Sequence, residues 1–112
     1  MFRFRRNKFG NIKTGGKDSK KECRRGLLLK QLEKEGKIKD LQEQVRFELQ
    51  PPFRNIQGKA IRKIEYVPDF VYYDCEKQVM ICEDVKGFRT VDYKLKAKMF
   101  QFKYPQYYFL ET

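Results

Sequence analysis

The spacing of apolar residues predicts a helix in the first third of the chain. Ser19 and Glu22 stand three residues apart in the order of a capping box, in which the two side chains satisfy free backbone amides of the first turn. Gly36 follows the last apolar position and is typical of the residue after a helix C-terminus. We therefore expect a helix over about residues 20–35. Its apolar stripe consists of Cys23, Leu28, Leu29 and Leu32.

Three strands are predicted after this helix. Apolar and polar residues alternate over residues 45–49, which is typical of a half-buried strand. Residues 60–73 are rich in Ile, Tyr, Phe and Val and predict a second strand, with a break or bulge at Pro68. Residues 78–86 predict a third strand.

A second helix and a final strand complete the predicted fold. Thr90 is placed to cap a helix over residues 91–104, and residues 107–110 predict a strand. The order of elements is then α-β-β-β-α-β, which indicates an α+β domain over residues 18–112 with a mixed sheet flanked by helices. One helix face carries Val91, Leu95, Met99 and Phe102, and another carries Tyr93, Ala97, Phe100 and Tyr104.

The chain is strongly and unevenly basic. It has 112 residues, enough for one domain, and a net charge of +11. Residues 1–25 hold ten Lys and Arg against two acids, a balance of +8, and residues 1–17 are interpreted as a basic arm or hairpin. Such a segment is typical of a protein that binds a polyphosphate, although a solvated tail has the same composition. We expect phosphate contacts from Arg3, Arg5, Arg6, Lys8, Lys20, Lys21, Arg24 and Arg25.

Residue types that are absent restrict the chemistry. The chain has no histidine, which excludes histidine-activated nucleophiles and histidine-containing zinc sites. Its three cysteines are far apart and indicate buried, reduced thiols. There is no apolar run as long as a membrane-spanning helix, and no apolar stretch follows the basic N-terminus as in a signal peptide. We expect a soluble, cytoplasmic protein without a membrane partner.

Two aspartates carry the candidate chemistry. If the second and third strands form a hairpin that turns at Glu76-Lys77, Asp69 lies directly opposite Asp84, and Lys86 shares the face of Asp84. Facing carboxylates destabilise a sheet unless a cation compensates them, and oxygen ligands without histidine suit magnesium or manganese. The alternative is a solvated face on which lysines neutralise both acids. Glu83 alternates to the other face and is expected either to support the site residues without touching the substrate or to be structural.

These motifs, in this order of elements, resemble the restriction-endonuclease-like PD-(D/E)xK nuclease superfamily, and the layout is similar to that of archaeal Holliday junction resolvases. More closely, the chain resembles a family of small phage proteins over about residues 8–110. The motifs that carry the resemblance are Ser19-Lys20-Lys21-Glu22, Pro68-Asp69, Glu83-Asp84-Val85-Lys86-Gly87 and Tyr93-Lys94-Leu95-Lys96.

The resemblance implies roles for individual residues. Asp69, Asp84 and the main-chain carbonyl of Val85 would bind Mg²⁺ or Mn²⁺, and Lys86 would position the attacking water. Glu22 would complete the site, although its role in the capping box is a rival explanation. On the second helix, the residues that would approach the scissile phosphate are Tyr93, Lys94 and Lys96.

The function implied is that of a metal-dependent endonuclease that hydrolyses DNA, with junctions or branches formed during phage recombination or replication in the host cytoplasm as the expected substrates. A four-way junction is the first expected substrate, and cutting it symmetrically would require a homodimer. No small-molecule cofactor is expected. The alternatives are a non-catalytic basic nucleic-acid-binding protein on the same fold, and a structural RNA-binding protein.

Overall fold

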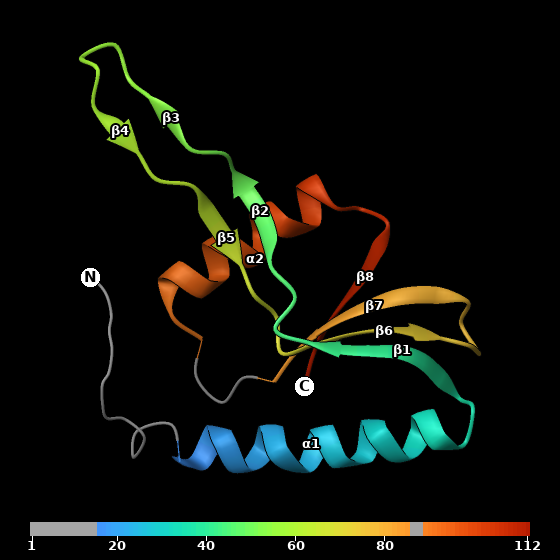
Figure 1. The fold of residues 1–112 in the computed structure, drawn as a ribbon. Coiled ribbons are helices and arrows are strands. Elements are labelled where there is room, and N and C mark those ends of the chain that lie inside the picture. The colour runs from blue at the N-terminus through green and yellow to red at the C-terminus, as the bar shows by residue number, and fades with distance from the viewer. Residues whose placement is uncertain (1–15, 86–88) are drawn as a thin grey trace.

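The computed structural model describes residues 16–85 and 89–112, which form a mixed four-stranded sheet between two helices (Figure 1). The sheet has the strand order β1-β6-β7-β8. Strands β1, β6 and β7 pair antiparallel, whereas β8 runs parallel to β7. Along the chain, these elements are α1 (Gly16–Lys34), β1 (Ile38–Glu43), β6 (Phe70–Asp74), β7 (Val79–Asp84), α2 (Val91–Lys103) and β8 (Tyr107–Glu111).

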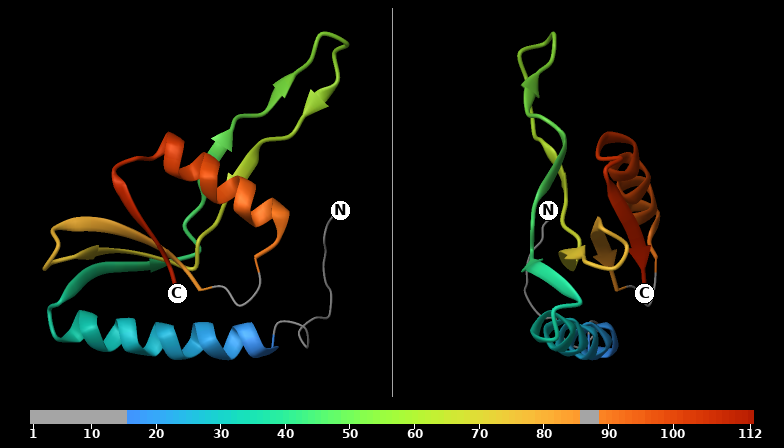
Figure 2. Two further views of the ribbon diagram at one scale, coloured as in Figure 1. Left: turned by 180° about the vertical axis from the view of Figure 1, so that it is seen from behind. Right: turned by 90° about the vertical axis from the view of Figure 1, so that its right-hand side faces the viewer.

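Each face of the sheet has its own apolar core and its own helix (Figure 2). Leu29 of α1 packs on one face, and Phe100 of α2 packs on the other. Successive residues of β7 alternate between these cores, because side chains of a strand point to opposite faces. The α1-side core contains Leu29, Ile38, Phe70, Tyr72, Ile81 and Val85, and the α2-side core contains Phe47, Leu49, Tyr66, Val71, Cys82 and Phe100.

A long two-stranded projection, called the β-arm here, extends from the body between β1 and β6 (Figure 1). Its base is the pair β2 (Phe47–Gln50) and β5 (Ile64–Tyr66), which packs against α2 through Phe47, Leu49 and Tyr66. Its outer part is the pair β3 (Phe53–Arg54) and β4 (Ala60–Ile61). The outer part lies well away from both helices in all three views (Figures 1 and 2).

The first helix ends as predicted but begins earlier. Gly36 has a φ of +78°, and the amide of Lys37 donates to the carbonyl of Leu32, so the helix ends in a Schellman motif. The helix begins at Gly16, and Ser19 therefore lies within it and is not its N-cap. The capping-box prediction was wrong because lysines around Ser19 are good helix formers, and each added residue gains a backbone hydrogen bond.

The first strand of the main sheet was not predicted. It is β1, whereas the strand predicted over residues 45–49 corresponds to β2 and pairs only with β5. The register of β1 with β6 shifts between Lys39 and Gln42, and Asp40 has a φ of +57°. This bulge interrupts the two-residue alternation by which strands are recognised in a sequence. The second strand, predicted over residues 60–73, is divided in the structure into the three strands β4, β5 and β6.

Several other predictions are confirmed. The α+β class with a mixed sheet is correct, and β6 and β7 pair in the predicted register, with Phe70 opposite Glu83. Helix α2 follows Thr90, whose side chain accepts a hydrogen bond from the amide of Tyr93. Within the described residues, neither helix is long and apolar enough to cross a membrane.

Candidate active site at the ends of β6 and β7

Two successive acidic residues at the end of β7 are buried on opposite faces of the sheet. Glu83 is 0% exposed and Asp84 is 1% exposed. Charged side chains are buried only where partners compensate the loss of water. The described partners of these two residues come from different elements.

Glu83 faces α1 and is fully engaged by other side chains. Arg25 donates from Nε to Oε2 at 2.5 Å and from Nη2 to Oε1 at 3.1 Å. The hydroxyls of Tyr72 and Thr112 donate to the same carboxylate at 2.6 and 2.9 Å. The hydrogen bond with Glu83 raises the pKa of Arg25, and burial raises that of Tyr72. Glu83 therefore joins α1, β6 and the segment after β8 to the end of β7, as the predicted structural role requires.

Asp84 faces the α2 side, where Tyr66 at the base of the β-arm donates its hydroxyl proton to Oδ2. Burial, and then the hydrogen bond to Asp84, raise the pKa of Tyr66 well above its ordinary value. The Cys82 thiol lies on the same face, and burial raises its pKa as well. Asp84 thus lies among aromatic side chains with little access to water and accepts a hydrogen bond from a phenol.

Asp69 brings a second carboxylate to the same end of the strand pair. It follows the buried Pro68 and precedes β6, and its Oδ2 accepts a hydrogen bond from the amide of Val85 at 2.7 Å. The Asp69 carboxylate therefore lies at the peptide that joins Asp84 to Val85. It is half-buried, so solvent or a ligand reaches it more readily than Asp84.

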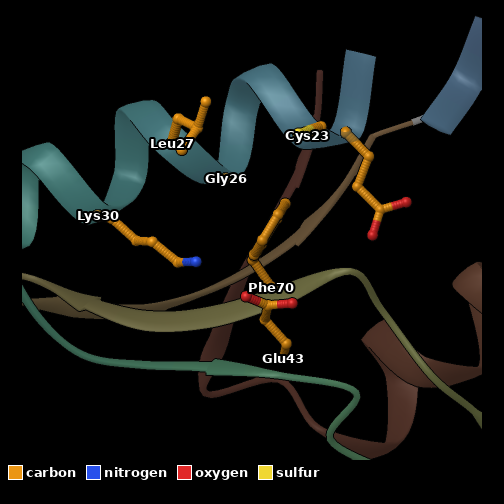
Figure 3. Close-up of a pocket in the computed structure, with 7 residues that line it drawn as sticks. Cys23, Gly26, Leu27, Lys30, Glu43 and Phe70 are labelled. Atoms are coloured by element: carbon orange, nitrogen blue, oxygen red, sulfur yellow. The ribbon is translucent and has the colours of Figure 1, made fainter. Parts of the chain in front are cut away.

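Glu22 lies on α1, where it lines a pocket of about 350 Å³ between α1 and the ends of β1 and β6. The Phe70 ring points from β6 towards α1 at Gly26, and Lys30 and Glu43 extend into the same space (Figure 3). Among residues 16–85 and 89–112, no three His, Cys, Asp or Glu side chains form a group that could hold a metal ion. Asp69 and Asp84 are therefore brought together, whereas Glu22 does not form a three-residue metal group with them.

The predicted nucleic-acid contacts are distributed over several surfaces. Lys20, Arg24 and Lys94 are exposed, and Lys21 and Lys96 are half-buried. Arg25 is paired with Glu83, and the hydroxyl of Tyr93 donates to Glu111 at 2.6 Å. Arg3, Arg5, Arg6 and Lys8, together with the predicted catalytic Lys86, lie outside the described residues.

Comparison with models of protein families places nearly the whole sequence in one family. Residues 2–110 match the model described as "Protein of unknown function (DUF1064)". The chain belongs to the DUF1064 family. No curated protein and no solved structure matches the DUF1064 chain.

Two residues of the DUF1064 site were not identified from the sequence. Tyr66 is the partner of Asp84, and Arg25, assigned to nucleic acid, is the partner of Glu83. One indirect signal was present, because two adjacent acids amid apolar strand residues each need a partner. It did not identify those partners, since Arg25 lies 58 positions from Glu83 and Tyr66 belongs to the β-arm.

Proposed function

We propose that this DUF1064 protein is a metal-dependent nuclease of the PD-(D/E)xK type that hydrolyses phosphodiester bonds in DNA. The observation that carries the proposal is the position of Asp69 and Asp84. The half-buried Asp69 carboxylate accepts a hydrogen bond from the amide next to the buried Asp84, where two antiparallel strands end. A solvated charge pair, the main alternative, does not explain why Asp84 is 1% exposed.

The arrangement of elements also supports this proposal. A helix, three antiparallel strands, a second helix and a strand parallel to the third make up the order expected for this superfamily. Fold alone does not establish an activity, so this support is an analogy. The net charge of +11 favours a polyphosphate substrate but reports affinity and not catalysis.

The donor set fits a hard divalent cation. Asp69, Asp84 and the main-chain carbonyl of Val85 provide oxygen ligands only, which magnesium and manganese prefer. A bound Mg²⁺ would polarise the scissile phosphate and stabilise the negative charge that develops on it. Glu22 remains a predicted contributor from α1, and Lys86 remains the residue predicted to position the attacking water.

Tyr66 contributes to the proposed site through Asp84. Its hydroxyl donates to Oδ2 and so fixes the rotation of the carboxylate before any ligand binds. The phenol is a donor at neutral pH, because an ordinary tyrosine pKa of about 10 already keeps it protonated, and burial raises the pKa of Tyr66 further. Packing of the Tyr66 ring against Phe100, at 5.2 Å between centroids, holds the hydroxyl in place.

A cleavage assay tests the proposal. Labelled linear duplex, flapped duplex and four-way-junction DNA are incubated with Mg²⁺, with Mn²⁺ and with a chelator. We compare the unchanged protein with Asp69→Asn and Asp84→Asn, which keep the side-chain volume and remove the charge. Glu76→Gln is the matched control, because Glu76 is an exposed acid in the turn at the far end of the β6–β7 hairpin.

The expected result is cutting that needs the metal, persists in Glu76→Gln and is lost in both aspartate variants. Binding without cutting of any substrate under either metal would overturn the nuclease proposal and leave a nucleic-acid-binding protein on this fold. Cutting that survives in Asp84→Asn would place the chemistry elsewhere. Circular dichroism of each variant excludes loss of fold as the cause.

A further inference from the structure

The end of the β-arm is a defined turn that holds one apolar side chain in solvent. The carbonyl of Asn55 accepts from the amide of Gly58 at 2.8 Å, and its side-chain oxygen accepts from the amide of Lys59 at 3.0 Å. Gly58 supplies a φ of +81°, and Nη1 of Arg54 donates to its carbonyl at 2.8 Å. Ile56 follows Asn55 in this turn and is fully exposed. An ordered turn that presents an isoleucine to water stabilises no core and suggests a contact with another molecule.

The outer part of the β-arm, residues 50–63, carries positive charge only, whereas its base also contains Glu48 and Glu65, and Glu65 pairs with Lys63 at 3.0 Å. Between Leu49 and Ile64 the sequence contains four basic residues and no acid. Phe53 adds a second exposed apolar side chain, with 48% of its surface accessible. A narrow cationic ribbon with an apolar tip is complementary to a polyanion that contains apolar surface. The four basic residues are Arg54, Lys59, Arg62 and Lys63.

The base of the β-arm is part of the candidate active site. Tyr66, the last residue of β5, donates to Asp84, and Asp69 lies between β5 and β6. Ile56 is ten residues from Tyr66, so at about 3.3 Å per residue the tip reaches about 30 Å from the site. That reach corresponds to about nine base pairs of duplex at 3.4 Å each.

We propose that the β-arm lies along a DNA duplex and that Ile56 inserts at an unstacked base step, so that the protein selects branched or bulged DNA. This inference rests on the proposed function, because it specifies the substrate class of the same site. A two-stranded β-ribbon fits a DNA groove, and apolar side chains of DNA-binding proteins separate base steps as wedges. Insertion costs less where stacking is already interrupted, as at a junction or bulge.

Charge argues against a second copy of the chain as the occupant of this arm. Two arms that each carry four cations and no acid between Leu49 and Ile64 would repel one another along their sides. DNA supplies a regular array of phosphates for the cations and a stacked apolar interior for the isoleucine. DNA would therefore contact both the cations and the exposed isoleucine of the arm.

The first experiment measures binding in chelator, so that no cutting is needed. Fluorescence anisotropy compares a four-way junction, a bulged duplex and a linear duplex, for the unchanged protein and for Ile56→Ser. Because fully burying an isoleucine contributes about tenfold or more in affinity, we expect Ile56→Ser to lose about that factor on the junction and bulge and little on linear duplex. Phe102→Ser is the matched control, since Phe102 is an apolar residue of α2 that is 90% exposed.

A second set of variants separates the contribution of the basic residues to DNA binding from that of Ile56. Lys59→Gln with Arg62→Gln should weaken binding to all three DNAs and lower the slope of log affinity against log salt by about two. Lys30→Gln with Lys34→Gln removes the same charge from exposed positions of α1 and should change the slope less. 2-Aminopurine beside the junction should brighten with the unchanged protein, because unstacking relieves its quenching, but not with Ile56→Ser.

Each outcome bears on one proposal. Equal junction preference in Ile56→Ser and the unchanged protein would overturn the wedge, whether or not the protein cuts DNA. Arm-dependent binding without metal-dependent cutting would retain the wedge and overturn the nuclease. Sedimentation that shows a dimer without DNA, and a monomer for Ile56→Ser, would reassign the arm to self-association and refute this inference. All the arm variants lie outside both cores and should leave the circular dichroism unchanged.

Discussion

Replacing Glu83 by glutamine should destabilise the fold much more than replacing its neighbour Asp84 by asparagine. Glu83 is 0% exposed and accepts four hydrogen bonds, two of them from Arg25. Glutamine has nearly the same volume, but its NH₂ group would face groups that are themselves donors. The guanidinium would also lose its counter-charge.

The magnitude follows from the burial of the pair. Breaking a fully buried ion pair costs about 3–5 kcal/mol, and the Arg25 side chain is 25% exposed, which reduces the cost of leaving it unpaired. We therefore expect Glu83→Gln to lower the free energy of unfolding by about 2–3 kcal/mol, and the melting temperature by about 10 °C. For Asp84→Asn we expect a loss below about 1 kcal/mol, because the amide oxygen of asparagine can still accept the hydrogen bond from Tyr66.

Urea denaturation followed by circular dichroism measures both values. Combining Glu83→Gln with Arg25→Met completes a double-mutant cycle, and a coupling energy of about 2 kcal/mol is expected if the pair acts as described. A loss below about 1 kcal/mol in Glu83→Gln, or equal losses in both acid variants, would refute the assignment of a structural role to Glu83 alone.

Three further predictions follow from single contacts. Tyr66→Phe removes the hydroxyl that orients Asp84, so metal-dependent cleavage should fall about 10- to 100-fold while circular dichroism stays unchanged; cleavage at the original rate would contradict the proposed role of Tyr66. Burial raises the pKa of Tyr66 and Tyr72 in the folded protein, so as the pH rises the unfolded chain loses these two protons first, near pH 10. The free energy of unfolding should therefore be constant below about pH 10 with respect to these groups and fall above it by up to about 1.4 kcal/mol per pH unit for each phenol. Urea denaturation at a series of pH values should show a smaller fall per pH unit in Tyr72→Phe. Gly26→Ala should raise the melting temperature slightly, because alanine favours a helix over glycine by about 1 kcal/mol. The new methyl would lie 3.3 Å from the Phe70 ring, and this ring borders a pocket into which it can shift. A lowered melting temperature would mean that the ring cannot move.

The parts of the fold that were predicted correctly are those with regular periodicity. Helix α2 begins after Thr90 as expected, because one cap and one apolar stripe coincide there. The pairing of β6 with β7 was also predicted, since a short turn fixes the register of a hairpin. Strand β1 was missed because a bulge at Asp40 places its two apolar residues that contact the core, the buried Ile38 and the partly buried Leu41, three positions apart instead of two.

The β-arm and the partners of the acids depend on contacts between distant segments. Residues 60–73 form a nearly continuous β-favouring stretch, yet the chain leaves the main sheet at the β-arm, and β5 pairs with β2 instead. The facing positions of Asp69 and Asp84 followed from the register alone. The roles of Tyr66 and Arg25 could not be predicted in this way. The alternation of a strand indicates which buried acid needs a partner, but it does not indicate which distant segment provides that partner.

Glu83 and Asp84 are separated by a single peptide bond but belong to groups of residues that can change independently. In related chains, replacement of Glu83 should accompany replacement of Arg25, because Glu83 alone leaves a buried carboxylate without its cation and Arg25 alone leaves a partly buried guanidinium without its anion. Asp84 and Tyr66 can be exchanged together while the first pair is kept. A descendant of that kind would retain the architecture and lose the proposed chemistry. Asp84 and Tyr66 should therefore distinguish relatives with the proposed chemistry from relatives that only bind, whereas Glu83 and Arg25 should be kept in both.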